Sequence, residues 1–248
     1  MKKILIAILI FFFPLIVLAA PAYVQDISGR GASPKALTFG SNTIAGNLIV
    51  VYMFTESNSD VLISTVTDSQ GNTFHFINRG TANATQFNTE EWYASNIIGG
   101  ADTITITAAS AVTIDANITE FSGVNTLDTS NGYTGGTPDN NPSIALTTSV
   151  NNELLTGIIV SASGNPSAGS GFVGRTNTGN GFAAFYLPED SNGTSNTAGS
   201  NPVTFTVTAS FNGGVAAAFK QVNNTPVVGP AIMIIRSFFK VRGFLTIR

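Results

Sequence analysis

His75 is the single histidine of the 248-residue chain, and it limits the chemistry that the sequence can support. A Ser-His-Asp triad would have to use it, but the sequence has no Gly-x-Ser-x-Gly turn to hold the serine. Because there is no second histidine and no cysteine, His-pair and thiolate zinc sites are excluded. Phe74 and Phe76 flank His75, so on a strand its side chain projects from the opposite face. We therefore expect a half-exposed strand histidine without a catalytic role.

Paired carboxylates are the other source of catalysis, because glycosidases need two acids roughly 5–9 Å apart. Glu90 and Glu91 are neighbours, so on a strand their side chains face opposite ways. Glu120 occupies an inward-facing position near a strand end, and we expect it to accept hydrogen bonds from the backbone amides of Ser122 and Gly123. The sequence has no cluster of acids on one strand. We therefore predict that the protein is not an enzyme, with a glycan-active hydrolase as the minor alternative.

Three aspartates, Asp68, Asp128 and Asp139, lie in segments rich in Asn and Gly, where carboxylate and carbonyl oxygens can bind Ca²⁺. The loop that follows Asp68 lacks the alternating acidic positions of a dedicated calcium loop, and Asp also caps turns without a metal. Both interpretations, a calcium site and metal-free turn caps, stay open. No other cofactor is indicated.

Aromatic side chains are the candidates for ligand binding. A flat ring can cover the apolar face of a sugar while Asn, Gln and Asp bind its hydroxyl groups. The alternative is core packing, since aromatic residues that alternate along a strand commonly point inward. Five residues are candidates for an aromatic platform: Trp92, Tyr93, Tyr133, Phe182 and Tyr186.

Alternation of polar and apolar residues predicts the strands that must position these groups. Residues 103–107 and 203–208 alternate Thr with Ile, Val or Phe, and such residues fit a pleated, half-buried surface. Residues 47–54 and 153–160 are more continuously apolar, which is typical of strands covered on both faces. Turn signals recur roughly every 8–12 residues, so the pattern predicts an all-β, two-sheet sandwich of jelly-roll or Ig-like type with roughly 11–13 strands.

The body also shows a weak internal similarity. Residues 102–121 and 202–219 each contain an alternating, Thr-rich strand followed by a strand of small residues that is closed by a Phe. If the likeness is more than chance, two similar groups of strands pack face to face.

The composition excludes several classes of protein. Only 10% of the residues are charged, against about 25% in a typical soluble domain, so neutral Ser, Thr and Asn side chains must cover the surface. A disordered charged protein, a coiled coil and a disulfide-stapled miniature fold are therefore excluded. All 14 acids lie between Asp26 and Asp190, which makes the body acidic and nucleic-acid binding unfavourable.

The sequence divides into three segments. Residues 1–22 predict a secretory signal peptide, in which Lys2 and Lys3 precede an apolar run and a small-x-small cleavage site; an uncleaved anchor is the alternative. Residues 23–225 form the predicted β-sandwich domain. Residues 226–248 form a basic, apolar tail that either docks as an extra hairpin, is poorly ordered, or contacts an anionic surface or another subunit. We expect no transmembrane span after signal removal, and a secreted or cell-surface location.

Five short motifs follow one another along the body. They are AGNLIVV (45–51), VTDSQGNTF (66–74), WYASNI (92–97), EFSGV (120–124) and AAAFK (216–220). Together they resemble a widespread, mostly uncharacterised family of secreted bacterial β-sandwich domains, over nearly all of residues 37–220. The resemblance implies an extracellular sandwich, often found beside adhesive or fibronectin-like modules, and no established catalytic residues. We expect the chain to differ from that family in lacking a second module and in carrying the basic tail.

These observations predict a secreted or cell-surface bacterial protein that acts without catalysis in adhesion, surface structure or ligand contact. The expected partner is an extracellular glycan or a surface component. A carbohydrate-binding module with an aromatic platform is the first alternative. A structural subunit that assembles through its tail or through an open edge strand is the second.

Overall fold

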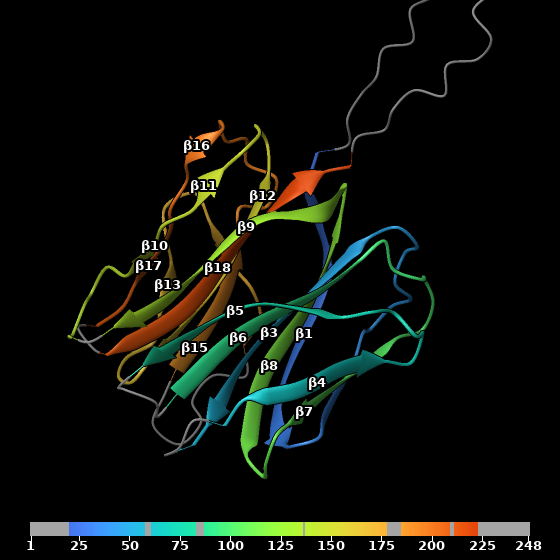
Figure 1. Ribbon diagram of the computed structural model, residues 1–248, viewed down its shortest axis with the longest axis horizontal. Helices are drawn as coiled ribbons and strands as arrows, with labels where there is room; N and C mark the ends of the chain where they lie inside the picture. The colour runs from blue at the N-terminus through green and yellow to red at the C-terminus, as the bar shows by residue number, and fades with distance from the viewer. Residues whose placement is uncertain are drawn as a thin grey trace, which may run out of the picture. The chain divides into compact units, whose positions relative to one another are not determined.

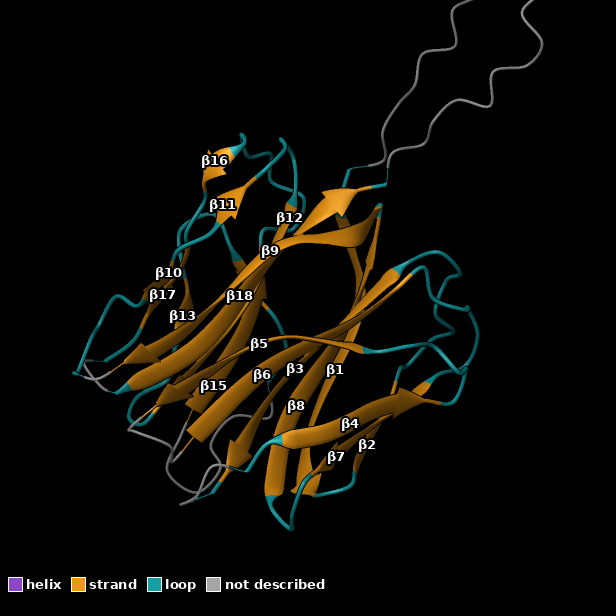
Figure 2. Cartoon of the chain, in the orientation of Figure 1, coloured by secondary structure: helices purple, strands orange, loops and turns teal. Residues whose placement is uncertain are grey.

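The computed structural model describes residues 20–57, 61–82, 87–135, 137–177, 185–208 and 211–222. Most of the predicted signal peptide, the tail at 226–248 and Phe182 lie outside these ranges. Every regular element within them is a β-strand, which confirms the all-β prediction (Figure 2). Among the residues described, no helix is long and apolar enough to cross a membrane.

Eighteen strands are described, and five of them have only two residues. The sequence did not predict these five, because a two-residue strand leaves no alternating pattern. The strands of the first half are β1 (Ala22–Ala32), β2 (Lys35–Thr38), β3 (Leu48–Glu56), β4 (Ile63–Asp68), β5 (His75–Ala82), β6 (Phe87–Ser95), β7 (Thr103–Ala108) and β8 (Thr113–Ser122). The strands of the second half are β9 (Val124–Gly135), β10 (Ser143–Ile144), β11 (Thr147–Thr148), β12 (Leu154–Ser161), β13 (Ser167–Ala168), β14 (Val173–Gly174), β15 (Phe185–Asp190), β16 (Gly199–Ser200), β17 (Val203–Thr206) and β18 (Asn212–Gln221).

Ten strands form one mixed sheet that curls into a half-barrel, in the order β1-β8-β3-β6-β5-β9-β18-β12-β15-β14 (Figure 1). The pair β5–β9 is parallel, whereas the strands on either side of it pair antiparallel. The other strands form the small sheets β2-β7-β4 and β10-β17-β13 and the pair β11–β16. The arrangement differs from the single two-sheet sandwich that the sequence suggested, because the main sheet curls over itself and carries small sheets on its outer face.

The strand order repeats between the two halves. In the first half, β1-β8-β3-β6-β5 is accompanied by β2-β7-β4; in the second, β9-β18-β12-β15-β14 is accompanied by β10-β17-β13. The register repeats as well, since Leu48 pairs with Phe121 and Leu154 pairs with Phe219. This duplication accounts for the similarity between the two halves of the sequence.

Three hydrophobic clusters stabilise the body. On β3, Ile49, Val51 and Met53 face the small sheet β2-β7-β4. The alternate residues of β3, among them Tyr52 and Phe54, face inward and meet residues of β12, β15 and β18 from the second half. A third cluster fills the space between β12, β18 and the small sheet that contains β17. The central strands are therefore covered on both faces, as their continuous apolar runs predicted.

Glycines allow β5 to approach β9 and β18 closely. A Cβ atom on Gly80 would overlap the backbone of Gly214 and Tyr133, and a Cβ on Gly132 would overlap the carbonyl oxygen of Arg79. Any side chain at these positions would push β5 away from the second half. The curl of the main sheet therefore depends on glycine at this crossing.

Polar contacts link the two outer strands of the main sheet. The amide of Thr176, just beyond β14, donates to Oδ2 of Asp26 on β1 at 2.8 Å. Arg175 donates from its terminal nitrogen to Oδ1 of Asp190 at 2.8 Å, and its guanidinium lies 3.8 Å above the ring of Tyr23. These contacts hold the edges β1 and β14 together.

We predict that Gly80→Ala lowers the free energy of unfolding by about 3 kcal/mol, because the new methyl group cannot fit without moving a backbone. Urea denaturation measures the change. Gly40→Ala is the matched control, since no heavy atom lies within 4 Å of a Cβ there, and it should change stability by less than about 0.5 kcal/mol. Equal effects of the two substitutions would contradict the proposed role of the crossing.

Candidate functional site

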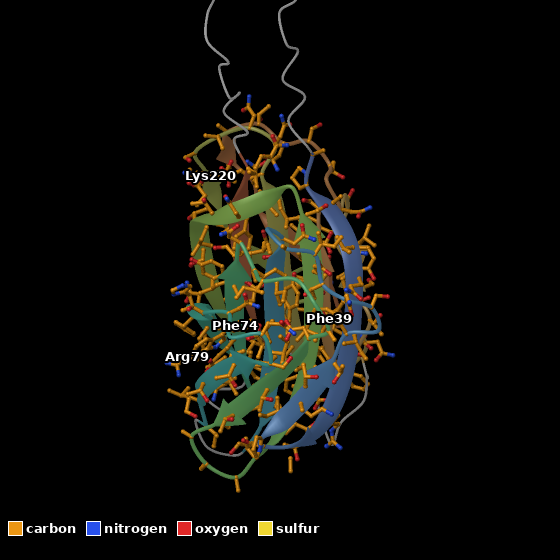
Figure 3. All side chains as sticks on the ribbon, turned by 90° about the vertical axis from the view of Figure 1, so that its right-hand side faces the viewer. Phe39, Phe74, Arg79 and Lys220 are labelled. Carbon is orange, nitrogen blue, oxygen red and sulfur yellow. The ribbon has the colours of Figure 1, made fainter. Side chains whose placement is uncertain are left out.

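A surface cleft of about 290 Å³ opens over β6, between β5 and the start of β4. Its lining is mostly apolar, with one carboxylate and one guanidinium. The six lining residues are Leu62, Ile63, Phe76, Arg79, Glu90 and Trp92. Figure 3 shows Arg79 reaching outward at the edge of the molecule.

A β-bulge brings the aromatic and charged residues of β5 to the same face. Phe76 pairs with Trp92 and Arg79 pairs with Glu90, and the register shifts between Phe76 and Asn78. In a regular strand, residues three positions apart would face opposite ways. The extra residue at the bulge corrects this, so Phe76 and Arg79 both line the cleft.

Phe76 and Trp92 form an aromatic corner. Their ring centroids are 5.6 Å apart and their planes meet at 72°, an edge-to-face arrangement. Phe76 is 49% exposed, whereas Trp92 is half-buried against the core cluster of the first half. Trp92 therefore forms a fixed wall of the cleft, and Phe76 provides an exposed apolar surface.

The buried carboxylate of Glu90 orients the indole of Trp92. Its Oε2 accepts a hydrogen bond from Nε1 of Trp92 at 2.8 Å, and its Oε1 accepts one from the amide of Ile63 at 3.2 Å. Glu90 thereby ties β6 to the first residue of β4. Glu91 points to the opposite face, into the layer between the two halves, as expected for neighbours on a strand.

The aromatic residues that the sequence predicted as one platform are not brought together. Tyr93 lies on the face opposite Trp92, with its ring centroid 5.4 Å from His75, which is exposed, and 5.5 Å from Phe219. Tyr186 is 1% exposed within the core. Tyr133 packs against the core of the second half, and Phe182 lies outside the described residues. Phe76, which lines the cleft, was not among the predicted residues, because alternation alone does not reveal the bulge that follows it.

The three aspartates considered for calcium lie apart. Asp68 caps a turn, accepting hydrogen bonds from the amides of residues 71 and 72 at 2.7 and 2.8 Å. Asp139 accepts hydrogen bonds from the amide of Asn141 at 2.9 Å and from the hydroxyl of Tyr133 at 3.2 Å. Asp128 lies within strand β9 rather than in a loop. Over the described part of the chain, no group of three or more His, Asp or Glu side chains is arranged to hold a metal ion.

Glu120 binds a different partner from the one expected. Its Oε1 accepts hydrogen bonds from the amide of Ile44 at 2.8 Å and from Nδ2 of Asn47 at 2.6 Å. Its Oε2 accepts one from Nε2 of Gln25 at 2.7 Å. The carboxylate thus ties β8 to β1 and to the turn before β3, rather than capping its own strand end.

Several other carboxyl groups are buried, and burial raises their pKa values because it removes water from the charged form. The pKa of Glu189 rises to about 8, and that of Glu153 rises to about 7. Burial, together with the charge of Asp68, raises the pKa of Asp102 to about 6. Burial also raises the pKa of Glu91 well above its ordinary value. None of these groups lines the cleft.

Comparison with known proteins gives no relative for this chain: no family model, curated protein or solved structure matches it. The resemblance of its motifs to secreted bacterial sandwich domains therefore stays a prediction.

We predict that the free energy of unfolding falls as the pH rises from about 5 to about 8. Glu189 keeps its proton in the folded state up to a pH of about 8, whereas in the unfolded chain it loses the proton near its ordinary pKa of 4.5. Unfolding therefore releases this proton between the two values, and the stability it provides at low pH is lost at about 1.4 kcal/mol per pH unit.

Urea denaturation at a series of pH values measures this slope. Glu153 and Asp102 should add to it in the same direction, because their pKa values are also raised. Glu189→Gln, which resembles the protonated acid, should make the slope shallower than in the wild type. A stability that is constant or increases over this interval would contradict the assignment.

Proposed function

We propose that the protein is a non-enzymatic carbohydrate-binding protein of the cell exterior, which binds a short saccharide in the cleft between Phe76 and Trp92. The observation that carries the proposal is the aromatic corner, in which an exposed ring stands edge-on to an indole that a buried carboxylate holds in place. A preformed aromatic surface suits the apolar face of a sugar ring, because little conformational freedom is lost on binding.

The size and polarity of the cleft support a short neutral or weakly charged sugar. A volume of about 290 Å³ is near the lower end for small-molecule sites, which suits one or two sugar rings. The guanidinium of Arg79 lines the same cleft as the two rings and supplies hydrogen-bond donors beside them. The predicted signal peptide and the neutral, hydroxyl-rich surface favour a location outside the cell.

The acids of the cleft argue against hydrolysis. Glycosidases use two carboxyl groups on either side of the scissile bond. Glu90 is the sole acid among the six lining residues, and both of its oxygens accept hydrogen bonds from neighbouring groups. We therefore propose a binding role, in adhesion or in contact with a glycan-bearing surface.

We also propose the finer fold, in which each half is a separate sandwich of jelly-roll type. In the first half, the strands β1-β8-β3-β6-β5 of the main sheet and the small sheet β2-β7-β4 make eight strands, and the two sheets share a hydrophobic cluster. Eight strands in two facing sheets are typical of a jelly roll. The second half repeats the order with β9-β18-β12-β15-β14 and β10-β17-β13. The two sandwiches then share one continuous sheet.

The fluorescence of Trp92 provides a direct test of binding, because it is the single tryptophan of the chain. We expect a glycan array to identify a ligand, and titration with that ligand to change the emission of Trp92. Phe76→Ala should weaken binding about tenfold or more, because a stacking surface is lost. Trp92→Ala should do the same on the array, with thermal melting as the check on folding.

Two substitutions outside the cleft serve as controls. Ile98 is also exposed, at 56%, but does not line the cleft, so Ile98→Ala should leave affinity unchanged. Tyr133→Ala should likewise leave it unchanged, because Tyr133 packs against another part of the body. Silence across a broad array, or an affinity that does not respond to Phe76→Ala, would overturn the proposal.

A further inference from the structure

Three adjacent strands bring a lysine and two acids together away from the cleft. Lys220 lies on β18, and its Nζ is 2.7 Å from Oδ1 of Asp128 on β9. Glu153 directly precedes β12, whose first residue, Leu154, pairs with Phe219 of β18. Lys220, labelled in Figure 3, therefore lies between the strand that carries Asp128 and the strand that follows Glu153.

A β-bulge aims Asp128 at the lysine. Ala218 pairs with Thr129, but the next residue, Phe219, pairs with Leu127, so Asp128 is the extra residue of the ladder. Bulges commonly re-aim a side chain in this way. The contact is thus built into the register of two long strands rather than formed by flexible side chains at a loop.

The carboxyl group of Asp128 is held by donors besides the lysine. The amide of Ser149 donates to its Oδ2 and the hydroxyl of Ser149 donates to its Oδ1, both at 2.7 Å. Only 7% of the Asp128 side chain is exposed, against 34% for Lys220. Hydrogen-bond donors on a carboxyl group withdraw charge from its carbon and stabilise the oxyanion that forms when a nucleophile attacks.

Glu153 carries a proton beside this pair. It is buried; its Oε1 accepts a hydrogen bond from the amide of Val150 at 3.1 Å, and its Oε2 has no hydrogen-bond partner among the described residues. Burial, opposed by the hydrogen bond from the amide of Val150, raises the pKa of Glu153 to about 7. Burial would also raise the pKa of Asp128, but hydrogen bonds from Lys220 and Ser149 outweigh it and lower this pKa to about 2. Below a pH of about 7, Glu153 therefore carries a proton while Asp128 is ionised.

We propose that Lys220 and Asp128 form an intramolecular amide bond, with Glu153 as the proton carrier. Glu153 gives its proton to the carboxylate of Asp128 and takes one from the ammonium of Lys220. The neutral amine then attacks Cγ of Asp128. The new C–N bond forms as one C–O bond breaks. The oxygen leaves as water with the proton that Asp128 received from Glu153 and one hydrogen of the amine, and Glu153 keeps the proton it took from the ammonium.

The geometry supplies what this condensation needs. The ladders on both sides of β18 hold the amine against the carboxyl group, and such fixed contact replaces a bimolecular encounter by an intramolecular step. The step transfers no electrons and uses no further reactant. The product would be a covalent link between β9 and β18 in a chain that has no cysteine.

Peptide mapping under denaturing conditions tests the proposal on the full-length chain purified after folding. We expect an intact mass lower than the sequence mass by one water, and a branched peptide that joins the segments containing Asp128 and Lys220. An unchanged mass, with linear peptides alone, would show that the contact is an ion pair only and would overturn the proposal.

Substitutions assign the roles. Lys220→Arg keeps the positive charge beside Asp128 but should abolish the loss of water, as should Glu153→Gln. Asp128→Asn should lose one ammonia instead of one water, because the leaving group changes. Asp139→Asn is the control and should keep the wild-type loss. Thermal melting checks folding, and the persistence of the water loss in folded Lys220→Arg would overturn the assignment even if Glu153→Gln fails to fold.

Discussion

The close approach of β5 to β9 and β18 is the constraint on which the structure depends. Glycines at this crossing let the backbones come nearer than any side chain would permit, so the main sheet continues from the first half into the second. Because the sheet curls at this place, the inner face of its first half meets the inner face of its second half. The two faces enclose the hydrophobic cluster that contains Tyr52 and Phe54. That cluster covers the inner faces of β3 and β12, and the other two clusters cover their outer faces, which explains why both strands are buried on both sides and almost entirely apolar.

The sequence predicted the features that follow from local patterns. Alternation and turn residues are local, so the all-β class and the two central strands were predictable, whereas the curl depends on contacts of Gly80 with residues far along the chain. In the site, Trp92 was among the predicted ligand residues and Phe76 was not, because the bulge that turns Phe76 and Arg79 to one face has no sequence signal. Asp128 was assigned to a loop because Asn- and Gly-rich segments are typical of loops, but it lies in a long strand.

The few charged groups of the body have specific positions in the fold. Charged groups of the body mostly occupy defined contacts instead of covering the surface: Glu90 orients Trp92, Glu120 ties β8 to its neighbours, and the pair of Arg175 and Asp190 closes the sheet at its outer strands. Neutral hydroxyl and amide groups cover the rest. A surface with so few charges gives little electrostatic attraction to a partner. Selective binding of a ligand would therefore depend on the shape of sites such as the cleft on β6.

The ends of the described body also determine how it would respond to tension. At the start of β1, Ala22 pairs with Ser122, and at the end of β18, Gln221 pairs with Val124, so both ends lie beside the turn at Gly123 (Figure 1). A force applied along the polypeptide would therefore enter and leave at the same pole of the body. It would load the few residue pairs around this turn and leave the distant strands, including β6, unstrained. The cleft on β6 would keep its shape while force acts on the two ends of the body.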